Sequence, residues 1–309
     1  MISRRNIRVK VMQTLYTLNT DGGQNNVDPV KLLQKQLDAT RQLFIYLLYV
    51  LTEVARYAEK DAAKRASKNL PSEQDLNVNI KLSGNEFLWK ILENASFKKA
   101  VENDKSYAIE GHALEIKKIY NELTKEEEYK QYIGAQSREK KSEKDIIIFI
   151  FVNMMLPSEN FISHLEEHFS NWDDDAEMMN QLMLSYLQKP ASYNLQEMIS
   201  REKWEFAKSL LITSLEKREL ARGLIAPKLK NWDAERIAIL DMLLMEMGVC
   251  ELLFFETIPT KVTINEYIDL AKAYSTPQSG QFVNGILDNI HKDLASQNKI
   301  HKVNFKLKA

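Results

Sequence analysis

Three arginines near the start of the sequence have a spacing that suits phosphate binding. Arg4, Arg5 and Arg8 occupy the first turns of a helix predicted over residues 3–19, and no acidic residue precedes Asp21. The start of a helix favours anions, because its dipole is positive there and its first amides are unpaired. A bound phosphate would therefore satisfy both the arginines and the amides. The charge pattern alone does not distinguish a phosphate-binding site from a basic helix end that is simply exposed to solvent.

A second arrangement has the spacing of metal ligands. Residues 164–168, HLEEH, fit H-x-x-E-H, the inverted zinc-protease pattern, in which His164, Glu167 and His168 would form a zinc hydrolase site. The alternative is the exposed polar face of a helix. Short patterns match by chance, and no third protein ligand stands out in the sequence. We therefore expect no metal, no cofactor and no enzymatic activity.

The composition is that of a globular, mainly helical protein. Of 309 residues, 44% are hydrophobic and 28% are charged, which excludes a disordered chain. Only 9 glycines and 7 prolines are present, so turns are few. The net charge is −1, which means that a nucleic-acid site must be a local basic patch. A single cysteine, Cys250, excludes an internal disulfide and a cysteine-based zinc site.

Two features bear on location. The sequence starts with arginines and lacks the apolar core of a signal peptide. The longest apolar run, residues 146–156, is too short to span a bilayer. We therefore expect a cytoplasmic protein with no membrane association.

Helical periodicity runs through most of the chain. Asp28 and Pro29 supply a cap and a first-turn proline for a long helix that fades near Ser67. Residues 146–152, IIIFIFV, have high strand propensity, yet their neighbours are helical and we expect a buried helix. Further helix starts are predicted at Ser158, at residues 171–175 and at residues 231–233.

Residues 257–290 read as two helices joined by a tight connection. Thr263 and Glu266 have the spacing of a capping box, in which each side chain binds a free amide of the first turn. Val262 and Tyr267 are placed to form a hydrophobic staple around that cap.

The first helix of this hairpin is expected to end near Ser275, because Pro277 restricts the residue before it. Ser279 is the candidate cap of the second helix. That helix is expected to bury Phe282, Val283, Ile286, Leu287 and Ile290.

The hairpin closely resembles the C-terminal signature of the NusB family of transcription antitermination factors. The similar residues are KVTINEYIDLAKAY at 261–274 and QFVNGILDNI at 281–290. Two other segments also resemble this family. One is the R-R-x-x-R pattern of residues 4–8 with QTLY at 13–16, and the other is ERIAILDMLLMEM at 235–247.

The resemblance covers residues 3–18 and roughly 200–291, and it implies an all-α NusB-like helical bundle with additional helices inserted in the middle. The implied RNA-binding core is residues 1–20 with 200–295, residues 28–195 are an expanded helical region, and residues 296–309 are a basic, frayed tail. The implied function is antitermination in ribosomal RNA transcription. The implied partners are single-stranded boxA-like RNA, a ribosomal protein that acts as NusE, and the RNA polymerase elongation complex.

The candidate RNA-binding residues are Arg4, Arg5, Arg8, Tyr16, Gln278, Gln281 and Phe282. The arginines would hold phosphates, and they are expected to be dispensable for folding because they precede the apolar face that begins at Val9. Tyr16 would stack on bases if it is exposed. Phe282 matches a family position near the RNA, although its spacing also suits the core. Gln278 and Gln281 can donate hydrogen bonds but cannot neutralise phosphate. The alternative function is a helical protein–protein adaptor without RNA binding, which acts through its middle region.

Overall fold

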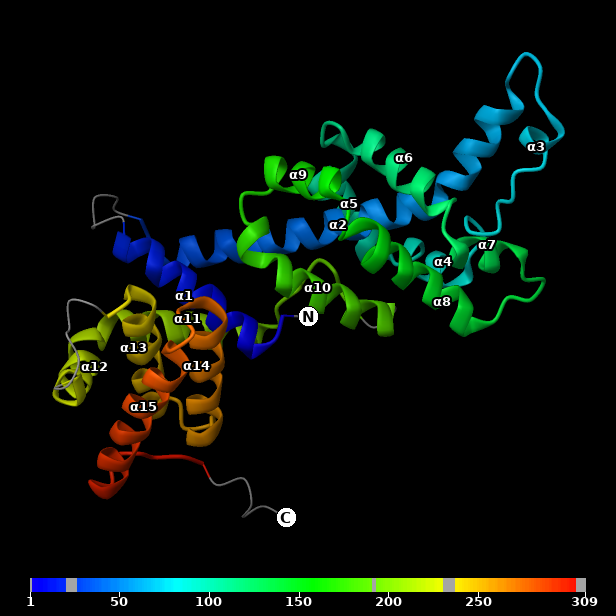
Figure 1. The fold of residues 1–309 in the computed structure, drawn as a ribbon. Helices are drawn as coiled ribbons and strands as arrows, with labels where there is room; N and C mark the ends of the chain where they lie inside the picture. The colour runs from blue at the N-terminus through cyan, green and yellow to red at the C-terminus, as the bar shows by residue number, and fades with distance from the viewer. Residues whose placement is uncertain (1, 21–26, 191–192, 230–236, 304–309) are drawn as a thin grey trace. The chain divides into compact units, whose positions relative to one another are not determined.

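The computed structural model describes residues 2–20, 27–190, 193–229 and 237–303. Within these ranges every regular element is a helix, so the predicted all-α class is confirmed (Figure 1). The chain forms two compact units. The first contains residues 38–198, and the second contains residues 2–37 together with the residues from 199 onward.

The long helix α2 (Pro29–Ala66) supplies the centre of the first unit. Residues 43–55 are all buried except Tyr49, which is partly exposed. A helix that is covered on every side is largely apolar, and Glu53 is the only charged residue of this stretch. The other elements of the unit are α3 (Glu73–Leu76), α4 (Glu86–Leu92), α5 (Ala95–Asp104), η1 (Ser106–Ala108), α6 (His112–Leu123), α7 (Glu127–Gly134), α8 (Lys140–Phe149), the π-helical η2 (Ile150–Met155), α9 (Glu159–His168) and α10 (Trp172–Gln188).

Local capping signals placed several helix starts correctly. Asp28 Oδ1 accepts a hydrogen bond of 2.9 Å from the Val30 amide, and Pro29 is the first residue of α2. Ser158 Oγ accepts from the Phe161 amide at the start of α9. Helix α10 begins at Trp172 as predicted, but the Asn171 side chain binds Asp175 Oδ2 at 2.7 Å and does not cap the helix.

The apolar run IIIFIFV is helical, as predicted, and is divided between α8 and η2. Four of its seven side chains are buried, and its two elements contact α4, α6 and α10, which explains why strand propensity did not decide its structure. No single helix in the described ranges is both long and apolar enough to cross a membrane. One pair, residues 140–155 with α9, meets that test jointly by length and composition but is bent by 80°.

The second unit is a helical bundle. Helices α13 (Ile239–Phe254), α14 (Thr260–Tyr274) and α15 (Ser279–Ser296) contact one another (Figure 1). Helix α1 (Arg4–Thr20) packs on α11 (Arg201–Glu216) and on α13. The remaining elements are α12 (Arg218–Ile225) and η4 (Ala226–Leu229). The predicted helix start at residues 231–233 lies outside the described residues.

The predicted capping box at Thr263 is wrong. Helix α14 begins at Thr260, and the Thr263 amide already donates to the Pro259 carbonyl inside the helix at 3.1 Å. The predicted staple is also wrong, because Val262 is exposed. The hydroxyl of Thr263 is instead buried and donates to the carboxylate of Glu251 at 2.8 Å.

The turn after α14 was predicted in part. Helix α14 ends at Tyr274 and Ser275 follows as its cap residue, as expected from Pro277. Ser279 does not cap α15, because it is the first residue of that helix and its hydroxyl donates to Asp241 Oδ2 at 2.8 Å.

The expectation of a frayed tail is wrong for the described part of the tail, which ends at residue 303. Lys302 Nζ donates to the carbonyls of Glu251 and Phe255 at 3.0 and 2.8 Å. The Val303 amide donates to the Glu256 carbonyl at 3.0 Å. The same two carbonyls also accept from the amides of Phe255 and Ile258, so Lys302 adds a second donor at the end of α13.

Candidate nucleic-acid interface

The first turn of α1 presents two arginines at the surface. Ser3 caps the helix, because its Oγ accepts from the Asn6 amide at 3.1 Å. Arg4 Nη2 donates to Glu202 Oε1 on α11 at 2.7 Å, and Arg5 Nη1 lies 3.5 Å from Asp269 Oδ2 on α14. The two arginine side chains are 42% and 41% exposed. Water screens such pairs, so another anion can replace the acidic partner at little cost.

Arg8 has a different environment, because its side chain is only 2% exposed. Its Nε and Nη2 donate to Oε2 and Oε1 of Glu251 on α13, both at 2.8 Å. Nη1 also lies 3.4 Å from Glu266 Oε2 on α14. The guanidinium carbon stands 5.5 Å from the ring centre of Phe206 and 6.0 Å from that of Tyr267. Arg8 is therefore an internal cation of the second unit.

Glu251 is the centre of this buried network. Its side chain is fully buried, and it accepts hydrogen bonds from Thr263 Oγ1 at 2.8 Å and from Tyr267 Oη at 3.2 Å, in addition to those from Arg8. Thr263 and Tyr267 are four residues apart on α14 and therefore face the same side of that helix. The carboxylate thus accepts four hydrogen bonds and connects α13, on which it lies, to α1 and α14.

Burial and the charge of Glu251 shift the pKa values of the residues around this carboxylate. Burial by itself would lower the pKa of Arg8, but the hydrogen bonds and charge of Glu251 outweigh it and raise that pKa above its ordinary value. Burial, reinforced by the charge of Glu251, raises the pKa of Tyr267 well above its ordinary value. Burial lowers the pKa of Lys302, against the opposing effect of Glu251.

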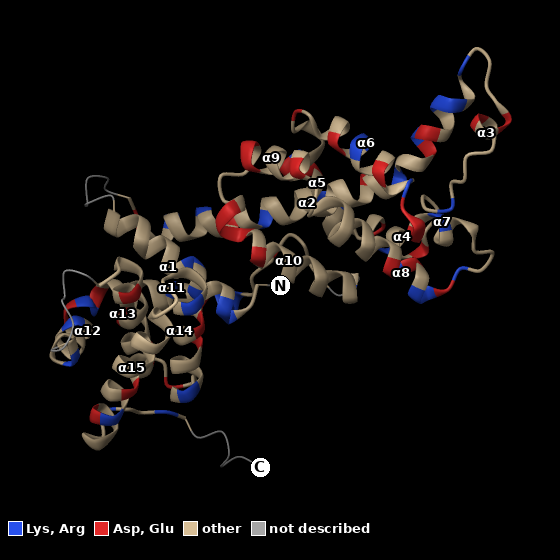
Figure 2. Ribbon diagram, in the orientation of Figure 1, with Lys and Arg blue, Asp and Glu red and all other residues tan. Residues whose placement is uncertain are grey.

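These contacts change the interpretation of the arginines in two ways. No acidic residue precedes Asp21 in the sequence, yet each arginine is compensated by an acidic partner from a helix distant in sequence. The expectation that all three are dispensable for folding is wrong for Arg8, which is a buried member of the core. Figure 2 shows the basic first turns of α1 beside the acidic residues of α14.

Tyr16 extends the exposed side of α1. It is an exposed aromatic residue, as the stacking hypothesis requires. Eleven residues separate it from Arg5, which is about three turns of an α-helix. Arg5 and Tyr16 therefore lie on the same side of α1, on the order of 16 Å apart along the axis.

The other three candidate residues are grouped at the start of α15. Gln278 and Gln281 are exposed, whereas Phe282 is 9% exposed and belongs to the core. The buried Ser279–Asp241 hydrogen bond fixes this turn against α13. Among the described residues, no hydrogen bond or ion pair joins Gln278 or Gln281 to α1, so the structure does not bring the two halves of the candidate set into direct contact.

A basic helix that sequence reasoning missed lies in the same unit. Arg222 Nε donates to Glu246 Oε1 at 2.6 Å, and Arg218 Nε lies 3.2 Å from Glu246 Oε2. Arg218 Nη2 also donates to Asn19 Oδ1 at the end of α1, at 2.7 Å. Glu246 is buried on α13, so α12 is held to the bundle by a second internal acid.

The histidines of the zinc pattern have other partners. His164 Nε2 lies 2.5 Å from Tyr46 Oη, and His168 Nδ1 lies 2.9 Å from the His164 carbonyl. Within the described residues, no group of three or more histidine, cysteine or acidic side chains could hold a metal ion.

A family model, curated relatives and a solved structure that match this chain all carry the name NusB. The model of the NusB family matches residues 162–292. This range starts earlier than the resemblance at roughly residue 200 and does not include residues 3–18. The transcription antitermination protein NusB of Bacillus mycoides is 40% identical over 90 residues, which cover 29% of this chain and 69% of that protein.

Two other relatives are matched over smaller shares of their length. The protein of the same description from Salinibacter ruber is 44% identical over 98 residues, which cover 32% of this chain and 61% of the relative. The one from Chloroherpeton thalassium is 45% identical over 78 residues, which cover 37% of the relative. A solved structure of T. maritima NusB is 35% identical, with 34% of this chain and 78% of that chain covered and a TM-score of 0.31.

Proposed function

The chain belongs to the NusB family, and on this premise we propose that it acts in transcription antitermination by binding RNA. The observation that carries the proposal is the 40% identity to the B. mycoides relative across 69% of that protein, which is described as a transcription antitermination protein. We further propose that the RNA is a single-stranded, boxA-like segment of ribosomal RNA transcripts. It would be bound together with a ribosomal protein that acts as NusE, within the RNA polymerase elongation complex.

Arg4 and Arg5 are the phosphate contacts in this proposal. Both guanidinium groups are partly exposed, and their acidic partners Glu202 and Asp269 are themselves on the surface. An exposed ion pair contributes about 0–1 kcal/mol, so a phosphate can replace either acid. Arg8 acts indirectly, because its contacts to Glu251 hold α1 in place and leave it no route to the surface.

Base contacts are proposed for the neutral residues. Tyr16 has an exposed ring that can stack on a base, as aromatic side chains do in single-stranded RNA sites. Gln278 and Gln281 present amide groups that can hydrogen-bond to base edges or to the backbone. Phe282 supports this turn from the core.

A salt-dependent titration tests the proposal. Labelled boxA-like RNA is titrated with the full chain at several salt concentrations, with and without the NusE-type ribosomal protein. The double variant Arg4→Ala, Arg5→Ala should bind more weakly. Its slope of log affinity against log salt should fall by about 0.7 for each lost phosphate contact.

The matched control removes two surface cations of the other unit, Lys64 and Arg65, by the same substitution. This control should leave the affinity and the slope unchanged. If the arginine variant has an unchanged slope of log affinity against log salt, Arg4 and Arg5 do not contact RNA phosphates. If the chain binds the ribosomal protein but no RNA, the adaptor function is the correct one.

A further inference from the structure

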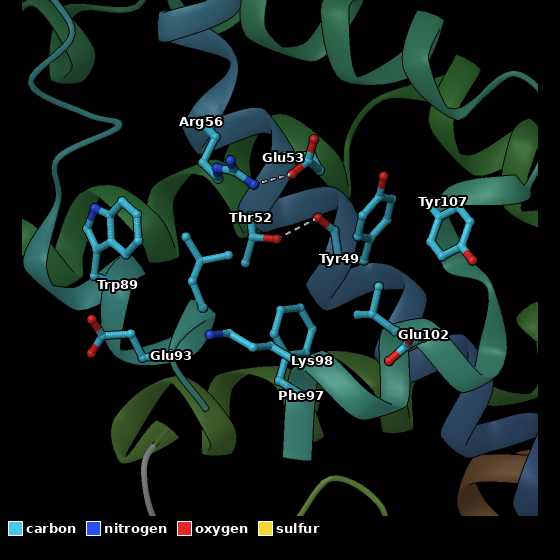
Figure 3. A pocket seen from close by; sticks show the side chains of 12 residues that line it. Tyr49, Thr52, Glu53, Arg56, Trp89, Glu93, Phe97, Lys98, Glu102 and Tyr107 are labelled. Carbon is cyan, nitrogen blue, oxygen red and sulfur yellow. Dashed lines mark hydrogen bonds and ion pairs between the residues drawn. The ribbon is translucent and has the colours of Figure 1, made fainter. Parts of the chain in front are cut away.

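A pocket in the first unit is lined by residues to which the proposed function assigns no role. Its volume is about 440 Å³, which is within the range of small-molecule sites. Helix α2 forms one wall, α4 and α5 form the opposite side, and Tyr107 of η1 closes one end (Figure 3). All these elements belong to the same compact unit.

Aromatic side chains supply most of the apolar lining. Tyr49, Trp89, Phe97 and Tyr107 line the pocket, and Trp89 and Tyr107 are exposed although they are large and apolar. The indole nitrogen of Trp89 donates to the Ser83 carbonyl at 3.0 Å, which fixes the ring and leaves its face available to a ligand. Burial and the charge of Glu53 raise the pKa of Tyr49 to about 12, so its phenol stays neutral near neutral pH.

The charged lining residues divide into paired and unpaired groups. Glu53 is paired with Arg56 at 3.0 Å and with Lys60, which lies outside the pocket lining, at 2.8 Å. By contrast, no hydrogen bond or ion pair among the described residues engages the side chains of Glu93, Glu102 or Lys98. Two carboxylates and one ammonium group therefore remain for a ligand. Figure 3 shows Glu93 at the Trp89 end of the pocket and Glu102 at the Tyr107 end.

We propose that this pocket binds a small organic cation with a planar apolar body. The lining holds three carboxylates, of Glu53, Glu93 and Glu102, against two cations, Arg56 and Lys98, and this excess favours a positive ligand charge. The faces of Trp89 and Tyr107 add to this preference, because the electron-rich face of an aromatic ring attracts cations. The body of the ligand would displace water from the apolar floor formed by Phe97, Leu92 and Val101. This site is independent of the RNA-binding proposal and can fail or succeed without it.

Three probes that share one indole body test the charge preference. Tryptamine is cationic, 3-methylindole is neutral and indole-3-propionate is anionic. Each is titrated into the full chain and followed by calorimetry and ligand-observed NMR. Tryptamine should bind once per chain, roughly three- to tenfold more tightly than 3-methylindole, and indole-3-propionate should bind most weakly.

Substitutions then assign the binding to this pocket. Glu102→Gln should bring the affinity for tryptamine down toward that of 3-methylindole without changing the latter. Lys98→Met should strengthen tryptamine binding. Trp89→Ala should weaken all three probes, and Tyr107→Ala tests the same point at the other end if Trp89→Ala does not fold. Glu166→Gln, an exposed acid on α9, is the matched control and should have no effect.

Several outcomes would overturn the proposal. If tryptamine binding does not saturate at millimolar concentrations, the chain has no such site. Equal affinity for the cationic and anionic probes removes the charge preference. Binding that is insensitive to Glu102→Gln, Trp89→Ala and Tyr107→Ala lies elsewhere on the chain.

Discussion

Arg8 and Glu251 are 243 residues apart in the chain and form a two-point ion pair, with Nε and Nη2 each 2.8 Å from one carboxylate oxygen. Their side chains are 2% and 0% exposed. Paired donors of this kind match the planar carboxylate and are stronger than neutral hydrogen bonds. Neither charge could remain buried alone, so each residue fixes the position of the other and, with it, the packing of α1 on α13.

We predict that Arg8→Met strongly destabilises the second unit. The substitution leaves Glu251 as an unpaired buried charge, and breaking one side of such a pair costs about 3–5 kcal/mol. Urea unfolding of the full chain measures the change. Arg4→Ala is the exposed control and should change the free energy of unfolding by less than about 1 kcal/mol.

The double variant Arg8→Met, Glu251→Gln separates the pair from simple loss of packing. Glutamine is neutral and can still accept from Thr263 or Tyr267. The double variant should therefore be more stable than Arg8→Met alone, which gives a coupling energy between the two positions. A double variant that is as unstable as the sum of the single ones would show that the charges are not coupled.

Gly248→Ala is predicted to disrupt the contact of α13 with α14 and α15. A Cβ at this position would lie 2.9 and 3.1 Å from the two methyl carbons of Leu287 and 3.3 Å from a ring carbon of Tyr267. Overpacking of this kind costs about 1–3 kcal/mol. Gly285→Ala in α15 is the matched control, because nothing lies within 4 Å of its added methyl. That change should stabilise the chain by up to about 1 kcal/mol, and thermal unfolding distinguishes the two directions.

The first unit should lose stability in mild acid. Burial, followed by the neighbouring His168, lowers the pKa of His164 below its ordinary 6.5. The unfolded chain then binds a proton near pH 6.5 that the folded chain does not. The free energy of unfolding therefore falls as the pH decreases below about 6.5, by up to about 1.4 kcal/mol per pH unit. His164→Gln, which can still accept from Tyr46, should flatten this slope when unfolding is measured from pH 7 to pH 5 (about the range of histidine titration).

His301→Gln is the control for that measurement, because His301 is exposed. It should leave the acid slope as it is in the unaltered chain. If the free energy of unfolding of His164→Gln still falls with decreasing pH as steeply as before, groups other than His164 cause the acid sensitivity.

The purified chain is expected to contain no stoichiometric zinc. His164 and His168 are engaged by Tyr46 and by a backbone carbonyl, and no third ligand joins them among the described residues. Elemental analysis after dialysis tests this expectation. One zinc per chain that disappears in His164→Ala would establish the metal site instead.

Local signals in the sequence were sufficient to place the starts of several helices. Ser3, Asp28 and Ser158 each cap the helix that was predicted to follow them. The predicted cap at Thr263 is wrong because α14 begins earlier, at Thr260, and the Thr263 hydroxyl binds Glu251, which belongs to a different helix. Periodicity and capping rules describe one helix at a time and contain no information about such a partner.

The buried role of Arg8 was missed for the same reason, although one signal was present. Asp241, Glu246 and Glu251 interrupt the otherwise apolar sequence of α13, and all three are buried with partners from other elements. Acids inside an apolar helix predict buried donors elsewhere in the chain. They do not identify which of the 42 lysines and arginines those donors are.

Glu251 also imposes an order on the assembly of the second unit during synthesis. Helix α1 leaves the ribosome early, whereas the carboxylate that receives Arg8 follows 243 residues later and Lys302 later still. Contacts this distant form slowly, and units completed in between fold first. The guanidinium of Arg8 therefore stays hydrated while residues 38–198 complete their own unit, and it becomes an internal charge only after α13 and α14 have been translated.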